Sequence, residues 1–97
     1  MYRIILKPET AKDIEHAYNW YEDQQNGLGD RFLETLKECY KKLEQYPFSF
    51  SEMAKSIRQL KLKTFPYVIV FEVIQHEVVI YAVFHTSQHL VKKFKKR

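Results

Sequence analysis

The chain has 97 residues and a formal net charge of +4, and 45% of its residues are hydrophobic and 29% charged. This balance excludes an intrinsically disordered chain, and the length is enough for one hydrophobic core but not for two ordinary domains. We therefore expect residues 1–97 to form a single domain.

The sequence also limits the compartment and the cofactors. The single cysteine, Cys39, cannot form an internal disulfide, which favours a reducing compartment. The apolar run within residues 1–8 is too short for a signal peptide or a membrane span, so we expect a cytoplasmic protein outside the membrane. There is no glycine-rich phosphate loop and no cysteine cluster that could hold zinc. We expect neither a cofactor nor a bound metal.

The N-terminal part of the chain predicts a strand followed by a helix. Residues 2–7 predict the strand, and Pro8 ends it because proline cannot donate to the ladder. Thr10 and Asp13 then resemble a capping box, which predicts the start of the helix. Apolar residues follow at helical spacing as far as residues 25–27, Gln-Asn-Gly, which favour a helix C-cap.

A second helix is predicted to begin near Gly29 and Asp30 and to end at Pro47. The joint between the two helices is short, so we expect an antiparallel hairpin whose apolar faces are buried together or on a sheet. The apolar stripe of the second helix consists of Phe32, Leu33, Leu36, Tyr40 and Leu43.

The remainder of the chain predicts a loop at residues 48–54 and then three strands. Residues 57–63 alternate between apolar and polar side chains, which is typical of a half-exposed strand. Residues 67–74 and 78–84 are nearly all apolar, so they predict two central strands paired as an antiparallel hairpin. The expected fold class is α+β: an N-terminal strand, a two-helix antiparallel hairpin, then a mainly antiparallel sheet with a short C-terminal segment.

The basic excess lies at the C-terminus. Five of the last six residues are basic, and without them the chain has 11 basic against 12 acidic side chains. One interpretation is a solvated end that aids solubility, and the other is an electrostatic contact with nucleic acid or an acidic protein. The five residues are Lys92, Lys93, Lys95, Lys96 and Arg97.

Three segments resemble the RelE/ParE superfamily of bacterial toxins from type II toxin–antitoxin systems. Residues 20–32, WYEDQQNGLGDRF, resemble the helix-hairpin junction of the ParE branch. Residues 65–73 resemble the central strand of the superfamily, and residues 78–87 resemble its final strand and the turn after it. The resemblance implies a RelE/ParE toxin-like fold and a toxin that a cognate antitoxin holds inactive.

This resemblance implies one of two activities. RelE-like members enter the ribosomal A site and cleave mRNA, whereas ParE-like members bind DNA gyrase and trap it in a DNA-damaging state. RelE-like nucleases carry arginines where this chain has Val68 and Gln88, so the resemblance is closer to the ParE branch. We expect a gyrase inhibitor. The alternatives are a ribosome-dependent mRNA endonuclease and a non-toxic module that only binds its antitoxin.

The resemblance and the charge pattern together give candidate functional residues. If the chain is a metal-independent endoribonuclease, Lys61 and Lys63 would hold phosphate and Tyr81 and His85 would act as acid–base groups. A histidine at position 85 also belongs to the ParE-like motif, where we expect it to fix the turn through hydrogen bonds. His85 and His89 have the spacing of two metal ligands, but no third ligand accompanies them, and no metal site is predicted. The candidate contacts with the target or with nucleic acid are Lys61, Lys63, His85, Gln88, Lys92, Lys93, Lys95, Lys96 and Arg97.

The candidate antitoxin-binding residues are Trp20, Tyr21 and Phe32. Trp20 lies off the apolar stripe of its helix, and tryptophan and tyrosine are frequent anchors of protein interfaces. The more ordinary interpretation places Trp20 at the edge of the core beside Phe48 or Phe50. The strand predicted at residues 2–7 is a further candidate surface, because an unpaired strand edge needs covering.

Overall fold

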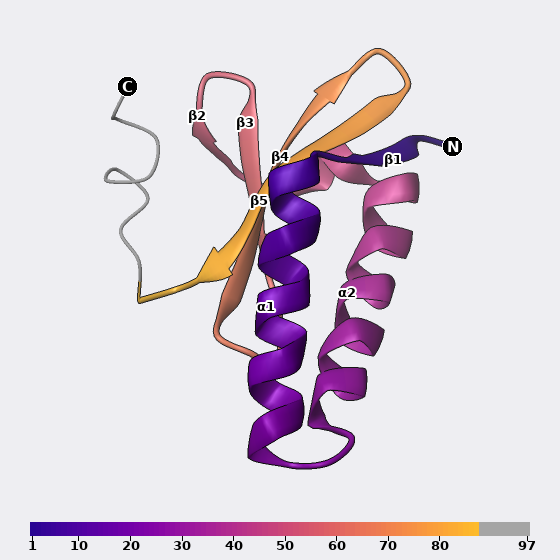
Figure 1. Cartoon of the computed structure of the whole chain (residues 1–97). Coiled ribbons are helices and arrows are strands. Elements are labelled where there is room, and N and C mark those ends of the chain that lie inside the picture. Colours follow the sequence, from indigo (N-terminus) through magenta and orange to yellow (C-terminus); the bar gives the residue numbers. More distant parts are fainter. Residues whose placement is uncertain (88–97) are drawn as a thin grey trace.

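The structure is a computed structural model that describes residues 1–87. Two helices lie side by side against one face of a five-stranded sheet (Figure 1). The elements are β1 (Arg3–Leu6), α1 (Pro8–Gln24), α2 (Leu28–Gln45), the 3₁₀ helix η1 (Pro47–Ser49), β2 (Glu52–Ala54), β3 (Ile57–Lys61), β4 (Tyr67–Ile74) and β5 (Glu77–His85).

The sheet has the strand order β1-β5-β4-β3-β2. The N-terminal strand β1 pairs parallel with β5, and every other neighbouring pair is antiparallel. The predicted α+β class, the helical hairpin and the antiparallel β4–β5 pair are therefore confirmed. Strand β1 lies at one edge of the sheet. Within residues 1–87 no helix has the length and apolar character needed to cross a membrane.

The predicted loop at residues 48–54 is wrong, because this segment contains η1 and the edge strand β2. Strand β2 is only three residues long and its pairing with β3 is irregular. Arg58 of β3 holds it in place by donating to the carbonyl of Phe50 at 2.6 Å and by an ion pair with Glu52 at 3.7 Å. A strand of three residues is too short to show an alternating pattern in the sequence.

The predicted capping role of Thr10 is also wrong. Helix α1 begins at Pro8, whose missing N–H costs nothing in the first helical turn. Thr10 is completely buried, and its hydroxyl lies 2.9 Å from the carbonyl oxygen of Tyr81 and 3.3 Å from that of Ile80. It therefore ties the first turn of α1 to strand β5.

The carbonyls that Thr10 contacts lie at an irregularity in β5. Phe71 pairs with Ile80 and its neighbour Val70 pairs with Ala82, so Tyr81 is an extra residue in β5. This is a β-bulge, which bends a strand and re-aims the side chains that follow it.

Most of the core lies between the helices and the sheet. Its fully buried side chains come from both helices and from β4 and β5, and a smaller buried cluster lies on the opposite face of the sheet, which we call the open face. The core members with the least exposure are Phe32, Leu36, Leu43, Ile69, Phe71, Val78, Ile80 and Val83. The open-face cluster contains Val68, Val70, Ala82 and Phe84.

A carboxylate in α1 fixes the turn of the helical hairpin. Glu22 accepts hydrogen bonds from the backbone N–H groups of Gly27 and Gly29, each at 2.9 Å. These N–H groups lie at the beginning of α2, where a negative charge is favourable. Gly27 has a φ of +89°, a conformation that side chains rarely adopt.

The two glycines predict different responses to alanine. At Gly29 a Cβ would lie 2.7 Å from the carbonyl oxygen of Tyr18, whereas at Gly27 it would meet nothing within 4 Å. We expect Gly29→Ala to lower the free energy of unfolding by about 2–3 kcal/mol, in spite of alanine's better helix propensity, because backbone must move. Gly27→Ala should cost about 1 kcal/mol through backbone strain alone. Urea denaturation of both variants tests this, and equal losses would contradict the close approach of α1 and α2.

Candidate functional site

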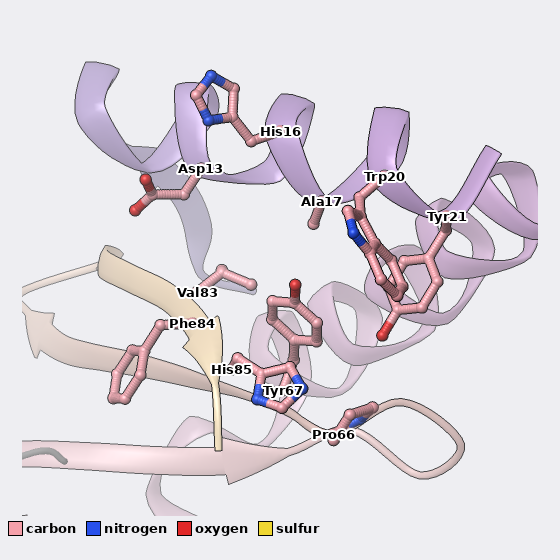
Figure 2. A pocket seen from close by; sticks show the side chains of 10 residues that line it. All are labelled: Asp13, His16, Ala17, Trp20, Tyr21, Pro66, Tyr67, Val83, Phe84 and His85. Carbon is pink, nitrogen blue, oxygen red and sulfur yellow. The ribbon is translucent and has the colours of Figure 1, made fainter. Parts of the chain in front are cut away.

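A cavity of about 550 Å³ opens between helix α1 and the neighbouring ends of β4 and β5. Figure 2 shows side chains descending toward it from α1 and rising toward it from the strands. Its volume lies in the range of sites that bind small ligands or single side chains. The described residues that line it are Asp13, His16, Ala17, Trp20, Tyr21, Pro66, Tyr67, Val83, Phe84 and His85.

Four aromatic rings form a continuous wall of this cavity. The ring centres of Trp20 and Tyr21 are 5.2 Å apart, those of Tyr21 and Tyr67 are 6.1 Å apart, and those of Tyr67 and His85 are 5.3 Å apart. All three contacts are edge-to-face, an arrangement that aromatic pairs favour. Trp20 is 58% exposed, so it stands at the rim while the other rings lie deeper.

Polar groups are placed among these rings. Burial, followed by the nearby Tyr21 and Asp13, raises the pKa of the Tyr67 phenol, so this side chain stays uncharged at neutral pH and can donate a hydrogen bond. In Figure 2 the Tyr67 ring points up from β4 toward α1, between Asp13 and Trp20. The cavity therefore combines apolar ring surfaces with a carboxylate and a phenol.

His85 holds the turn that follows β5. Its Nδ1 accepts a hydrogen bond from the backbone N–H of Ser87 at 3.1 Å and lies 2.9 Å from the Ser87 hydroxyl. A backbone N–H is always the donor, so Nδ1 is unprotonated and the proton of the neutral ring is on Nε2. The backbone N–H of Thr86 also donates to the carbonyl of Pro66 at 2.8 Å. These bonds give His85 the turn-fixing role expected from the sequence.

The residues proposed for RNA cleavage are not brought together. Tyr81 lies on the open face, where its hydroxyl donates to Glu72 at 2.7 Å, and this hydrogen bond raises the pKa of the phenol. His85 contacts Tyr67 on the helix face instead. Two groups on opposite faces of one sheet cannot act on the same phosphodiester.

The two candidate lysines also lie far from Tyr81. Lys61 and Lys63 are exposed, and Lys61 pairs across the sheet with Val68. Val68 in turn pairs with Phe84, which puts Lys61 two strands away from Tyr81 and about 10 Å further along the strand direction. Val68 is buried in the open-face cluster and offers no charged group that could bind phosphate.

The structure separates the three proposed antitoxin-binding residues. Trp20 does not pack beside Phe48 or Phe50, so the interpretation of Trp20 as a core-edge residue is wrong. Phe48 instead contacts Tyr2 and lies under the guanidinium of Arg58. Trp20 is exposed because α1 turns its apolar side, with Ala17 and Tyr21, toward the sheet and leaves position 20 at the rim.

Phe32 was expected to contact the antitoxin, and this needs correcting because its side chain is completely buried. It lies against the rings of Tyr21, Phe65 and Tyr67 at 5.4, 5.3 and 5.1 Å, and so supports the cavity wall from behind. Tyr21 is also nearly buried, but it reaches the cavity. Of the three residues, Trp20 alone has a large exposed surface.

Several expected residues lie outside the described part of the chain. These are His89 of the considered metal pair and the candidate contacts Gln88, Lys92, Lys93, Lys95, Lys96 and Arg97. Within residues 1–87, no group of three or more His, Cys, Asp or Glu side chains could hold a metal ion.

Asp13 and His16 line the cavity but were not expected from the sequence to be site residues. They lie at positions i and i+3 of α1, on the same side as Ala17 and Trp20 at i+4 and i+7. This spacing was visible in the sequence, but Asp13 had been assigned to the helix cap.

The fold is shared with solved toxin structures. One is described as the chromosomal ParDE TA system from P. aeruginosa, with a TM-score of 0.76 and 19% identity over 88% of this chain and 96% of that chain. Another is the isolated E. coli RelE toxin, with a TM-score of 0.68 and 17% identity over 96% of this chain and 93% of that chain. These similarities show that the chain shares the fold of these two structures.

The family follows from the sequence. A model of the ParE toxin of the type II toxin–antitoxin system parDE matches residues 4–90. The chain therefore belongs to the ParE toxin family and is the toxin component of a type II toxin–antitoxin system, in which its partner is an antitoxin. A comparison with curated proteins gave no significant match.

The hydrogen bonds of His85 predict the effect of two substitutions. His85→Leu removes the acceptor for the Ser87 N–H, and we expect the free energy of unfolding to fall by about 1 kcal/mol or more. His85→Asn also loses the ring contact with Tyr67, but its Oδ1 can accept from the same N–H, so it should lose less. Urea denaturation of both variants measures the difference. If both lose the same stability, Nδ1 contributes nothing to the turn.

Proposed function

We propose that this toxin inhibits DNA gyrase by binding it directly, and that a cognate antitoxin neutralises it by covering its surface. Membership of the ParE toxin family carries the proposal. An inhibitor of this kind needs an exposed binding surface and no catalytic residues of its own.

The arrangement of the acid–base candidates supports this choice over RNA cleavage. Metal-independent cleavage needs a base, an acid and phosphate-binding cations around one phosphodiester. Tyr81 and His85 lie on opposite faces of the sheet, and the hydroxyl of Tyr81 already donates to Glu72. The ribosome-dependent nuclease therefore has less support among the described residues than the gyrase inhibitor.

The proposed gyrase contact includes the exposed Lys61 and Lys63 at the end of β3 and in the segment after it. Their charges suit a surface at which gyrase holds DNA, together with the basic residues of the C-terminal segment. Such rim charges mainly affect the rate of association and its salt dependence. The exposed Trp20 on α1 is assigned to the antitoxin.

A supercoiling assay with the full-length toxin, freed from any co-purifying antitoxin, tests the proposal. We expect inhibition of gyrase and accumulation of cleaved DNA at micromolar toxin. The double variant Lys61→Ala, Lys63→Ala should weaken inhibition by about tenfold or less, because exposed charges contribute little each. A nuclease would lose activity by about a hundredfold or more when its phosphate-binding cations are removed.

A matched control removes the same charge from another surface. Lys37 and Lys41 are exposed on α2, and the double variant Lys37→Ala, Lys41→Ala should inhibit gyrase as well as the unmodified toxin. Normal supercoiling at micromolar toxin would reject the gyrase target. Cleavage of mRNA on translating ribosomes would then favour the nuclease, and antitoxin binding without toxicity would favour the non-toxic module.

A further inference from the structure

The cavity beside α1 lies along an acidic helix. The basic excess of the chain lies in its last six residues, whereas α1 contains five acidic residues and one lysine. The described residues that line the cavity include Asp13 and no lysine or arginine. The wall that they form therefore favours a positively charged group over a negatively charged one.

The rings of the cavity favour a cation. The faces of tryptophan and tyrosine rings carry partial negative charge, and a cation within about 6 Å of a ring centre is attracted to them. Tyr21 contacts both Trp20 and Tyr67 edge-to-face, so the three rings enclose the space at different angles instead of filling it as a flat stack.

We propose that this cavity binds an arginine side chain of the antitoxin, with the guanidinium between the aromatic wall and the carboxylate of Asp13. This inference rests on the proposed neutralisation by an antitoxin and names the group that the toxin recognises. Trp20 at the rim covers the apolar stem of the arginine, and the deeper rings and Asp13 receive its charged end.

The geometry matches an arginine better than the other side chains that a partner could offer. A guanidinium is planar, stacks on aromatic rings and donates in pairs to a carboxylate, whereas a lysine ammonium is a strongly hydrated point charge. An acidic side chain would be repelled by the carboxylate of Asp13. A purely apolar side chain would remove water from that half-exposed carboxylate without adding a hydrogen bond to it, and this desolvation costs free energy.

The first test needs no antitoxin. The full-length toxin, labelled with ¹⁵N, is titrated with N-acetyl-arginine N-methylamide and, in parallel, with the uncharged citrulline analogue of the same shape. Trp20 is the chain's single tryptophan, so its indole N–H signal reports directly on the rim of the cavity. We expect a saturable shift with the arginine probe at millimolar concentrations and none that saturates with citrulline. Equal responses to the two probes would overturn the inference.

Matched variants identify the carboxylate. Asp13→Asn should weaken binding of the arginine probe by about fivefold or more, because it removes the only acidic group among the described lining residues. Glu15→Gln makes the same change of charge at an exposed position of α1 that does not line the cavity, and should bind as the unmodified toxin does. Trp20→Ala should weaken binding as well. Because Trp20 is exposed, this variant is expected to fold, so it provides a test even if Asp13→Asn does not fold.

The second test uses the toxin–antitoxin complex. Each antitoxin arginine is changed to glutamine and combined with Asp13→Asn or Glu15→Gln in double-mutant cycles. We expect one arginine to couple to Asp13 by about tenfold in dissociation constant and not to Glu15.

If the complex forms and neutralises the toxin but no arginine couples to Asp13, the inference fails while the proposed function stands. Coupling of an apolar antitoxin residue to Trp20 alone would overturn it in the same way. If the toxin neither binds an antitoxin nor inhibits gyrase, the proposed function itself is wrong.

Discussion

One extra residue in β5 determines which side chains reach the cavity. Val78 and Ile80 face the helices before the bulge at Tyr81, and Val83 faces them after it. Strict alternation through the strand would have turned the residues after Ile80 the other way, with Ala82 toward the helices and His85 away from them. Thr10 stabilises the bulge by donating to the carbonyl beside it, so the register of β5 and the position of α1 depend on each other.

The regular elements were predictable because their patterns are strong. The stripe of α2 and the apolar run of β4 gave the hairpin and the central strand, and both are confirmed. The bulge was not predictable, since residues 78–84 are nearly all apolar and carry no alternation that could reveal a break. The cap assigned to Thr10 failed for a related reason, because its partner lies about 70 residues away, on β5.

The site was predictable only in part. Trp20 was singled out because it lies off the helical stripe, and the structure gives it the exposed position that this implies. Phe32 was expected to contact the antitoxin as well, but it belongs to the packing behind the wall. Residues from α1, β4 and β5 meet at the cavity, and no local pattern shows that these segments are neighbours (Figure 2). Tyr81 and His85, close in sequence, were proposed as partners and lie on opposite faces.

The pairing of β1 with β5 has a consequence for how the toxin is made. Arg3 and Glu77, which are 74 positions apart, form an ion pair between the first strand and the last. Contacts of such long range slow folding, because a long loop must be closed to form them. While β5 is still being synthesised, β1 therefore has no strand to pair with, and the cavity lacks the residues that β5 contributes. The cavity, whose lining includes residues of β5, is therefore complete only after the last strand has left the ribosome.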